Sequence, residues 1–190
     1  MELHNLFGGA FTCKLPSYSA DMSKIRQIPD NQEVFCHEQS DQSLIIEILE
    51  RVDKEDDESI KYHFKEICIA NDANNVEILE IINVLNFIDS TECDSCLILK
   101  SKENISKFNE EVKNPIFLIL ALFRYKKYNA DVLFTFNDPM FDNGTCSNRW
   151  TEDNIMETIY SLNLKNSDIF TSVMTFFKEG KERCRNDGKS

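Results

Sequence analysis

Two cysteines three positions apart are the pair of residues whose spacing most directly suggests chemistry. Cys93 and Cys96 have the CxxC spacing, which lets two thiolates share a metal ion or form a redox pair. Neither a second CxxC nor a pair of histidines follows them, and a thioredoxin-type site would open a helix within a βαβ unit. The pattern therefore favours two ordinary cysteines at a junction between a loop and a strand, with a metal or redox protein as the alternative.

Other patterns typical of catalysis are missing from the sequence. His4, His37 and His63 stand alone, so no two histidines have the spacing of metal ligands on a helix. Gly8-Gly9 lacks the further glycines and the lysine of a phosphate-binding loop, and no G-x-S-x-G nucleophile motif occurs. We therefore expect no cofactor, no metal ion and no bond-making activity of the chain's own.

The most unusual feature of the sequence is a cluster of carboxylates between residues 30 and 58. Eleven acidic residues stand there against two basic ones, Arg51 and Lys54, and the resulting local charge of −9 is three quarters of the chain's −12. Such a cluster could be a metal site, a catalytic acid/base pair, a solvated surface or a docking face for a basic partner. The acidic residues are Asp30, Glu33, Glu38, Asp41, Glu47, Glu50, Asp53, Glu55, Asp56, Asp57 and Glu58.

The stretch from Ser43 to about Lys54 is predicted to form a helix, with Asp41 as the N-cap that accepts hydrogen bonds from the first turn. At about 100° per residue, Glu47 and Glu50 then share the face opposite an apolar stripe, with Ile46 close by. Carboxylates beside apolar area are what a protein-binding patch offers. The residues alone leave two interpretations open, an ordinary solvated helix face and a docking face.

Composition limits the class of protein. The chain has 190 residues, 42% of them hydrophobic and 14 of them Phe, enough for one domain with a real core. A net charge of −12 argues against nucleic acid or an anionic membrane as the main partner.

The first twenty residues lack the layout of a secretory signal, no apolar run reaches membrane-spanning length, and the seven cysteines are scattered. We therefore expect the cytosol or nucleus, a reducing compartment.

Strands and helices are interleaved along the sequence. Strands are predicted at residues 33–37, 61–69, 76–87 and from 97, and the strongest signal is a hairpin formed by 116–125 and 131–137. A helix is predicted from Thr151 or Asp153 to about Leu162, followed after Phe170 by a polar, frayed tail. This order predicts an α+β fold with a mostly antiparallel sheet.

Six segments together closely resemble the Ran guanine nucleotide release factors, small nuclear proteins that bind the GTPase Ran. The resemblance implies a PsbP-like fold, a curved and mostly antiparallel sheet with helices on both faces. It runs in order from Leu6 to Phe170, so we expect one domain over 1–170 and a flexible tail over 171–190. The segments are LFGGAF (6–11), IPDNQEVFCH (28–37), DQSLIIEILE (41–50), YHF (62–64), DVLFTFNDP (131–139) and LNLKNSDIF (162–170).

The resemblance also implies a function and a site. The matching acidic and polar positions are expected to bind Ran and promote guanine nucleotide release, as a GTPase regulator in nucleocytoplasmic transport, found in nucleus and cytoplasm. The alternative is a non-exchanging adaptor that uses the same face, and animal members of the family are also associated with trafficking of a voltage-gated sodium channel. We expect a monomer that does not insert into membranes. The site positions are Asp30, Glu33, Asp41, Glu47 and Glu50, with the adjacent His37, Gln42 and Ile46.

Overall fold

The fold is built on a seven-stranded sheet in the computed structural model, which describes residues 1–88, 92–106, 113–140 and 146–187. Each neighbouring pair of strands is antiparallel. In spatial order the strands are β3 (Ser19–Asp21), β4 (Gln32–His37), β5 (Ser43–Glu50), β9 (Ala130–Pro139), β8 (Lys113–Tyr125), β7 (Ser95–Ser106) and β6 (Asn74–Asn83).

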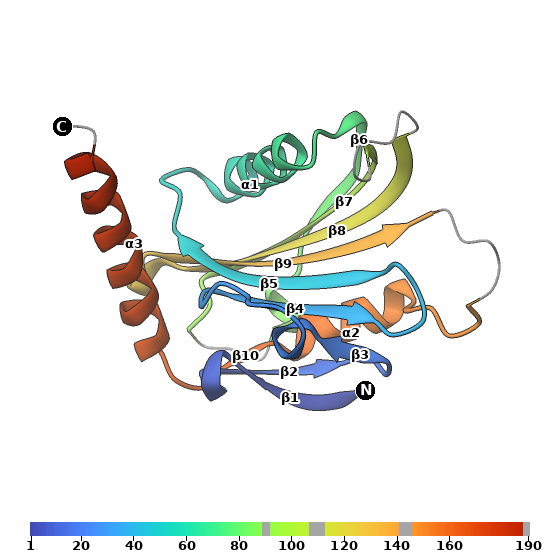
Figure 1. Ribbon diagram of the computed structural model, residues 1–190, viewed down its shortest axis with the longest axis horizontal. Helices are drawn as coiled ribbons and strands as arrows, with labels where there is room; N and C mark the ends of the chain where they lie inside the picture. Colours follow the sequence, from blue (N-terminus) through green and yellow to red (C-terminus); the bar gives the residue numbers. More distant parts are fainter. Residues whose placement is uncertain (89–91, 107–112, 141–145, 188–190) are drawn as a thin grey trace.

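A small sheet and three helices complete the fold. The sheet consists of β1 (Glu2–Leu6), β2 (Phe11–Leu15) and β10 (Asn163–Leu164), and the helices are α1 (Asp56–Ala70), α2 (Glu152–Ser161) and α3 (Asp168–Asp187). The large sheet is curved, with α1 on one side of it, the small sheet and α2 on the other, and α3 at the end where β5 finishes (Figure 1). The predicted α+β fold, a mostly antiparallel sheet with helices on both faces, is confirmed.

Two hydrophobic cores occupy the two faces of the large sheet, because successive strand side chains point to opposite faces. On one face, Ile60 and Phe64 of α1 pack on leucines of β7, β8 and β9. On the other face, the rings of Phe11, Tyr125 and Phe170 pack with centroids 5.0 to 6.1 Å apart. These three rings join the small sheet, the large sheet and α3.

The segment predicted as a helix from Ser43 to about Lys54 is instead the strand β5. Leu44, Ile46 and Ile48 are fully buried while the residues between them are only half-buried, which is the two-residue period of a strand. The prediction was wrong because five apolar residues within six positions fit a helical stripe as well as an alternating pattern. Pairing with β4 on one side and β9 on the other decides for the strand.

The reverse error concerns residues 61–69, which were predicted as a strand and lie within α1. The buried residues of this helix are Ser59, Ile60, His63 and Phe64, whose spacing places them on one face. The first turn of the helix carries three carboxylates, Asp56, Asp57 and Glu58. Negative charge is favoured there because the helix dipole is positive at its N-terminus.

The remaining predicted strands are confirmed, except that the one predicted at 76–87 ends at Asn83. The strong hairpin is β8 and β9, joined by the 3₁₀ turn η4 (Lys126–Tyr128), after which Asn129 adopts a left-handed conformation with φ of 51°. Asparagine tolerates that conformation better than most residues. The strand predicted at 33–37 is β4, the one at 76–87 is β6 followed by η3 (Leu85–Phe87), and the one from 97 lies in β7.

The segment expected to be a frayed tail after Phe170 continues the helix α3, which runs from Asp168 to Asp187. Phe170 and Val173 are buried in the core, so the first turns of this helix pack on the domain. The boundary expected at residue 170 therefore falls inside a helix. Among the described residues, no helix is both long and apolar enough to cross a membrane.

Replacing Thr151, the N-cap of α2, by alanine is expected to lower the free energy of unfolding by about 1 kcal/mol. The Thr151 hydroxyl accepts a hydrogen bond from the Asn154 amide, and the Asn154 side chain accepts one from the Thr151 amide. Urea denaturation followed by circular dichroism measures the loss. Thr171→Ala, at an exposed position of α3, is the control and should change the free energy by less than about 0.5 kcal/mol. Equal stability of Thr151→Ala and wild type would contradict the role of the cap.

Candidate functional site

The hairpin of β4 and β5 carries most of the residues predicted to bind a partner. Asp41, predicted as a helix N-cap, is an exposed residue of the turn between the two strands, because the helix that it would cap does not form. Glu50 lies at the other end of β5. At about 3.3 Å per strand residue, the two carboxylates lie about 30 Å apart along the strand. The predicted positions therefore fall at two separate ends of the hairpin.

Ile46 was expected to be exposed beside the carboxylates, but its side chain is fully buried. It pairs in register with Glu33 on β4 and Phe134 on β9, and belongs to the core on the side of α2. The reason is the alternation of strand side chains, which sends Ile46 inward when Glu47 faces outward. Ile46 therefore contributes to packing and not to a docking surface.

His37 and Gln42 are also buried, at the turn end of the hairpin. The Gln42 Oε1 accepts a hydrogen bond from the Trp150 amide at 2.8 Å, and its Nε2 donates to the Trp150 carbonyl at 2.9 Å. The His37 Nδ1 accepts from the Gln39 amide at 3.0 Å, so its Nε2 carries the hydrogen donated to the Asn148 carbonyl at 2.8 Å. Both side chains hold the segment before α2 against the sheet, which makes them supports of the fold.

Glu33 is half-buried and points toward the start of the chain, where its Oε1 accepts a hydrogen bond from the Phe7 amide. Burial raises the pKa of the Glu33 carboxyl above its usual value, the Phe7 hydrogen bond lowers it, and the negative charge of Asp21 raises it again. The net shift is upward. Glu33 therefore links β4 to the turn after β1, and only part of its carboxyl is available to a partner.

The raised pKa of Glu33 predicts a specific pH dependence of stability. The native state binds this proton more tightly than the unfolded state does, so stability falls as the pH rises from about 4 through the native pKa. Glu33→Gln keeps an oxygen for the Phe7 amide and removes the titration. The stability of Glu33→Gln relative to wild type should therefore increase with pH across this window, measured by urea denaturation at several pH values. Glu38→Gln, at an exposed position, should show no such trend, and parallel curves for wild type and Glu33→Gln would contradict the assignment.

Glu47 and Glu50 both reach solvent at the end of β5. Glu47 is half-buried and accepts a hydrogen bond from the Gln32 side chain at 2.9 Å, whereas Glu50 is exposed. Because they are three residues apart in a strand, they point to opposite faces of the sheet and do not share one helical face. Asp30 is exposed next to them, since the following residue, Asn31, hydrogen-bonds to the backbone of Ile48. Asp30, Glu47 and Glu50 are called the β5-end carboxylates below.

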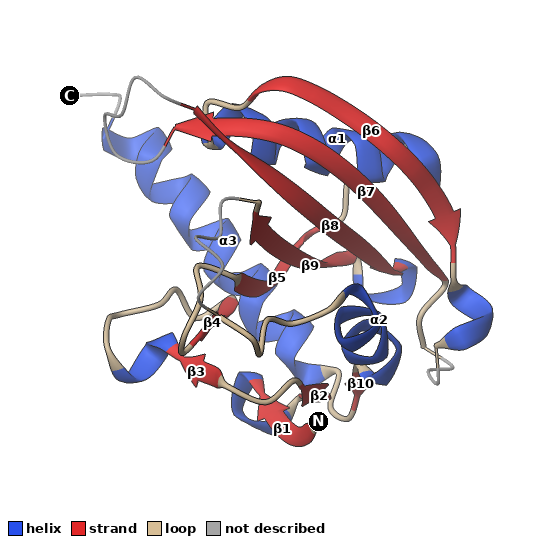
Figure 2. Ribbon diagram, turned by 90° about the vertical axis from the view of Figure 1, so that its right-hand side faces the viewer, coloured by secondary structure: helices blue, strands red, loops and turns tan. Residues whose placement is uncertain are grey.

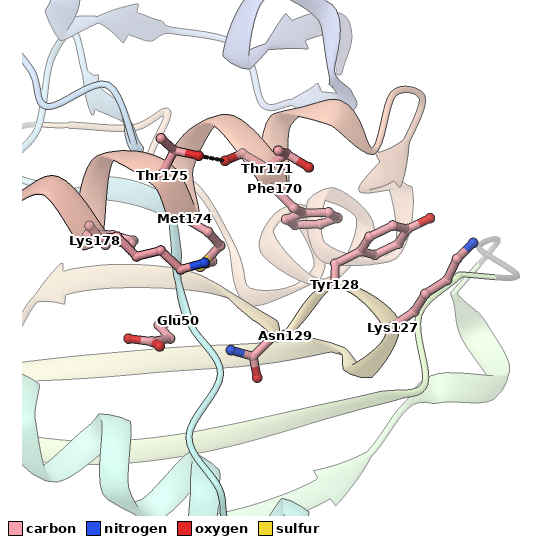
Figure 3. A pocket seen from close by; sticks show the side chains of 10 residues that line it. Glu50, Lys127, Tyr128, Asn129, Phe170, Thr171, Met174, Thr175 and Lys178 are labelled. Carbon is pink, nitrogen blue, oxygen red and sulfur yellow. Dashed lines mark hydrogen bonds between the residues drawn. The ribbon is translucent and has the colours of Figure 1, made fainter.

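Glu50 stands between two grooves. One, of about 420 Å³, opens between α1 and α3; Tyr62 and Phe177 contribute aromatic walls and Glu66 a second carboxylate. The other, of about 360 Å³, lies between η4 and α3, where Lys127 and Lys178 bring positive charge (Figure 3). The groove between α1 and α3 therefore places carboxylates beside apolar walls, the combination expected of a surface that binds basic side chains with aliphatic stems, whereas the two lysines of the second groove would repel such side chains.

A buried ion-pair network, which was not predicted from the sequence, holds the connector that follows Glu50. Arg124 of β8 is fully buried, and its guanidinium reaches two carboxylates and two carbonyls of the connector. Its nitrogens donate to Asp131 Oδ1 at 3.1 Å, Asp56 Oδ1 at 2.8 Å, the Lys54 carbonyl at 2.8 Å and the Val52 carbonyl at 2.6 Å. Arg124 of the large sheet thus fixes the path of the chain from β5 into α1.

Part of this network has a signal in the sequence. Arg124 and Asp131 are directly opposed across the β8–β9 hairpin, and opposite charges at opposed strand positions stabilise a sheet. A lone arginine within an otherwise apolar strand could have drawn attention to the pair. His63 also belongs to the network, because its Nε2 lies 3.0 Å from Asp131 Oδ2. It could not be found in this way, because it comes from a segment predicted as a strand.

Cys93 and Cys96 are both buried with free thiols. Burial raises the pKa of the Cys93 thiol to about 11, and it also raises the pKa of the Cys96 thiol. The thiolate is the form that binds metals and attacks disulfides, so these positions disfavour both reactions. In the part of the chain that the structure describes, no group of three or more His, Cys, Asp and Glu side chains could hold a metal ion.

The sequence also matches a known family. The family model described as "Ran-interacting Mog1 protein" matches residues 4–139, more than half of the chain. The chain belongs to this family. The resemblance found in the sequence is thereby confirmed, and the match covers all three β5-end carboxylates.

Relatives from several organisms carry names that describe their roles. "Ran guanine nucleotide release factor" of Danio rerio is 39% identical over 87% of this chain and 97% of its own length. The Homo sapiens protein of the same name is 35% identical, covering 87% and 94%. "Nuclear import protein MOG1" of Saccharomyces cerevisiae is 26% identical, covering 71% and 65%. The crystal structure of the Saccharomyces cerevisiae Ran-binding protein Mog1p superimposes with a TM-score of 0.69 at 22% identity over 88% of this chain, which shows the same fold.

Proposed function

We propose that the protein binds the GTPase Ran and promotes release of its guanine nucleotide, as a regulator without bond chemistry of its own. Family membership and the names of the relatives support this proposal. The observation that carries it is Glu50 beside the apolar groove between α1 and α3, with Asp30 and Glu47 reaching solvent at the same end of the hairpin. The name of the yeast relative further supports a role in nuclear transport, with the protein in both nucleus and cytoplasm.

The physical basis of such an activity is competition for positive charge. A GTPase holds its nucleotide through backbone amides, a phosphate-loop lysine and a Mg²⁺ ion that bridges phosphate oxygens. A carboxylate brought close to that site pairs with the lysine or disfavours the ion, and the nucleotide is held less tightly. By linkage, a factor that prefers the empty GTPase lowers its nucleotide affinity by the same ratio, with about 1.4 kcal/mol of coupling for each tenfold change.

The structure supports Asp30, Glu47 and Glu50 as the docking carboxylates among the eight predicted positions. All three reach solvent at one end of the hairpin, whereas Asp41 is exposed at the other end. Glu50 is the best placed of the three, because it lines the groove between α1 and α3 and its strand pairs with β9 up to this residue. A carboxylate on a rigid strand loses little conformational freedom when a partner binds.

The test is release of fluorescent GDP from Ran with and without the protein, at low and at high salt. We expect faster release with the protein, and a weaker effect at high salt because screening reduces attraction between surface charges. Binding without faster release would replace the exchange activity by the adaptor role. Absence of binding to GDP-loaded, GTP-loaded and empty Ran would remove the proposed function altogether.

A further inference from the structure

The far edge of the large sheet presents a second surface, distinct from the β5-end carboxylates. β6 is the last strand of the sheet order and pairs only with β7 among the described strands. Figure 2 shows it as the outermost strand, arching along the border of the sheet. Four strand spacings separate β6 from β5, or about 19 Å across the sheet. A molecule bound at β6 therefore leaves the β5 end accessible.

The exposed edge carries several large apolar side chains. Residues 74–80 are all exposed, and they include three large apolar side chains within four positions: Val76, Ile78 and Leu79 are 41%, 43% and 43% exposed. The edge strand also offers unpaired ladder groups of its backbone, which are a template for another strand. Of the features that guard such an edge, β6 lacks lysine and proline but has two glutamates and two register shifts.

A second copy of this chain is a poor occupant of the edge. If two copies of β6 paired about the midpoint between Ile78 and Leu79, Glu77 of one would oppose Glu80 of the other, and directly opposed like charges destabilise a sheet. Each chain also carries a net charge of −12, so the copies repel. Two register shifts, between Asn74 and Glu77 and between Ile78 and Glu80, bend the strand and restrict long, regular pairing.

The same features suit a short basic segment. β6 carries two glutamates and no basic residue, and each glutamate pairs in register with a lysine of β7, Glu77 with Lys102 and Glu80 with Lys100. Glu80 forms an ion pair with the Lys100 amine, which also contacts Glu152 of α2. Glu80, Lys100 and Glu152 together therefore keep one negative charge. We propose that β6 is a docking edge for an extended segment of a partner protein, rich in lysine or arginine and aliphatic at alternate positions, which adds to the sheet as an eighth strand.

The proposal is tested with a short fluorescent peptide that alternates lysine and valine and matches the length of the exposed residues 76–80 of β6. Fluorescence anisotropy at low salt should show binding by wild type, and amide hydrogen exchange should show protection of residues 76–80. Ile78→Lys/Leu79→Lys should weaken binding at least tenfold. Leu3→Lys/Ile25→Lys, at two exposed aliphatic positions outside β6 (71% and 73%), changes the net charge equally and should bind like wild type. The same peptide with two central prolines should not bind, because proline cannot continue a ladder.

Three results would overturn this assignment. They are no binding by wild type, equal weakening in the two double variants, and a wild-type dimer in sedimentation that Ile78→Lys/Leu79→Lys abolishes. The last would make a second copy the occupant. The outcome is also separable from the function proposed above, because a variant with lysine at Glu47 and Glu50 should bind the peptide through β6 almost as wild type does.

Discussion

Glu47→Lys/Glu50→Lys is expected to weaken Ran binding about a hundredfold and to remove most of the acceleration of nucleotide release. Each reversal replaces an attraction to a basic side chain by a repulsion, worth about 1.4 kcal/mol or tenfold in affinity. The fold should persist, because both side chains reach solvent and neither belongs to a hydrophobic core. Titration of fluorescent Ran and stopped-flow release of labelled GDP measure the two effects, and circular dichroism verifies the fold.

The control for this variant is Glu38→Lys/Asp153→Lys. It makes the same change in net charge at two exposed positions away from the end of β5, so it reports the contribution of overall charge alone. Its affinity for Ran should stay within about threefold of wild type, since distant charges are screened at physiological salt. Wild-type affinity in a folded Glu47→Lys/Glu50→Lys protein would rule out the β5 end as the docking surface.

Arg124→Met is expected to destabilise the protein by about 3–5 kcal/mol, the largest effect on stability that we anticipate for a single substitution. Methionine fills part of the volume but leaves the fully buried Asp131 carboxylate without its guanidinium partner, and an uncompensated buried charge is costly. It also removes the donors to the Val52 and Lys54 carbonyls. Urea denaturation measures the change in the free energy of unfolding.

Lys127→Met is the matched control, because Lys127 is an exposed cation that pairs with Glu92 at 3.2 Å. An exposed ion pair contributes about 0–1 kcal/mol, so the loss should be small. A double variant, Arg124→Met with Asp131→Leu, should recover part of the stability, since replacing a whole buried pair by apolar groups is often tolerated. Equal stabilities of Arg124→Met and Lys127→Met would show that the buried network contributes little.

The elements that the sequence predicted well are those whose pattern is local. The β8–β9 hairpin combines two apolar runs with a short polar turn, and α2 has its cap and its apolar positions within a dozen residues. β5 was predicted as a helix and part of α1 as a strand, because the apolar residues of both segments fit a helical and an alternating pattern equally well. The choice between helix and strand depended on β9, which comes more than eighty residues after the start of β5, and on the leucines under α1.

The candidate site was predictable in composition but not in orientation. The density of carboxylates and the family resemblance pointed to Asp30, Glu47 and Glu50, and the structure leaves all three accessible. The assumed helix placed Ile46 beside them, whereas the real strand turns it into the core. His37 and Gln42 were named by proximity in sequence, and their partners lie more than a hundred residues later, at Asn148 and Trp150.

The anchoring of the connector by Arg124 couples the docking end of β5 to the centre of the molecule. The carbonyls that it holds belong to residues 52 and 54, but the guanidinium comes from a central strand, β8. Local opening of the docking end would break these hydrogen bonds and leave a buried guanidinium without two of its acceptors, so the connector should open less readily than an unanchored loop. A partner would meet a surface already in its final shape, and folding newly made chains would acquire that surface only after the hairpin, far downstream in the sequence, had closed.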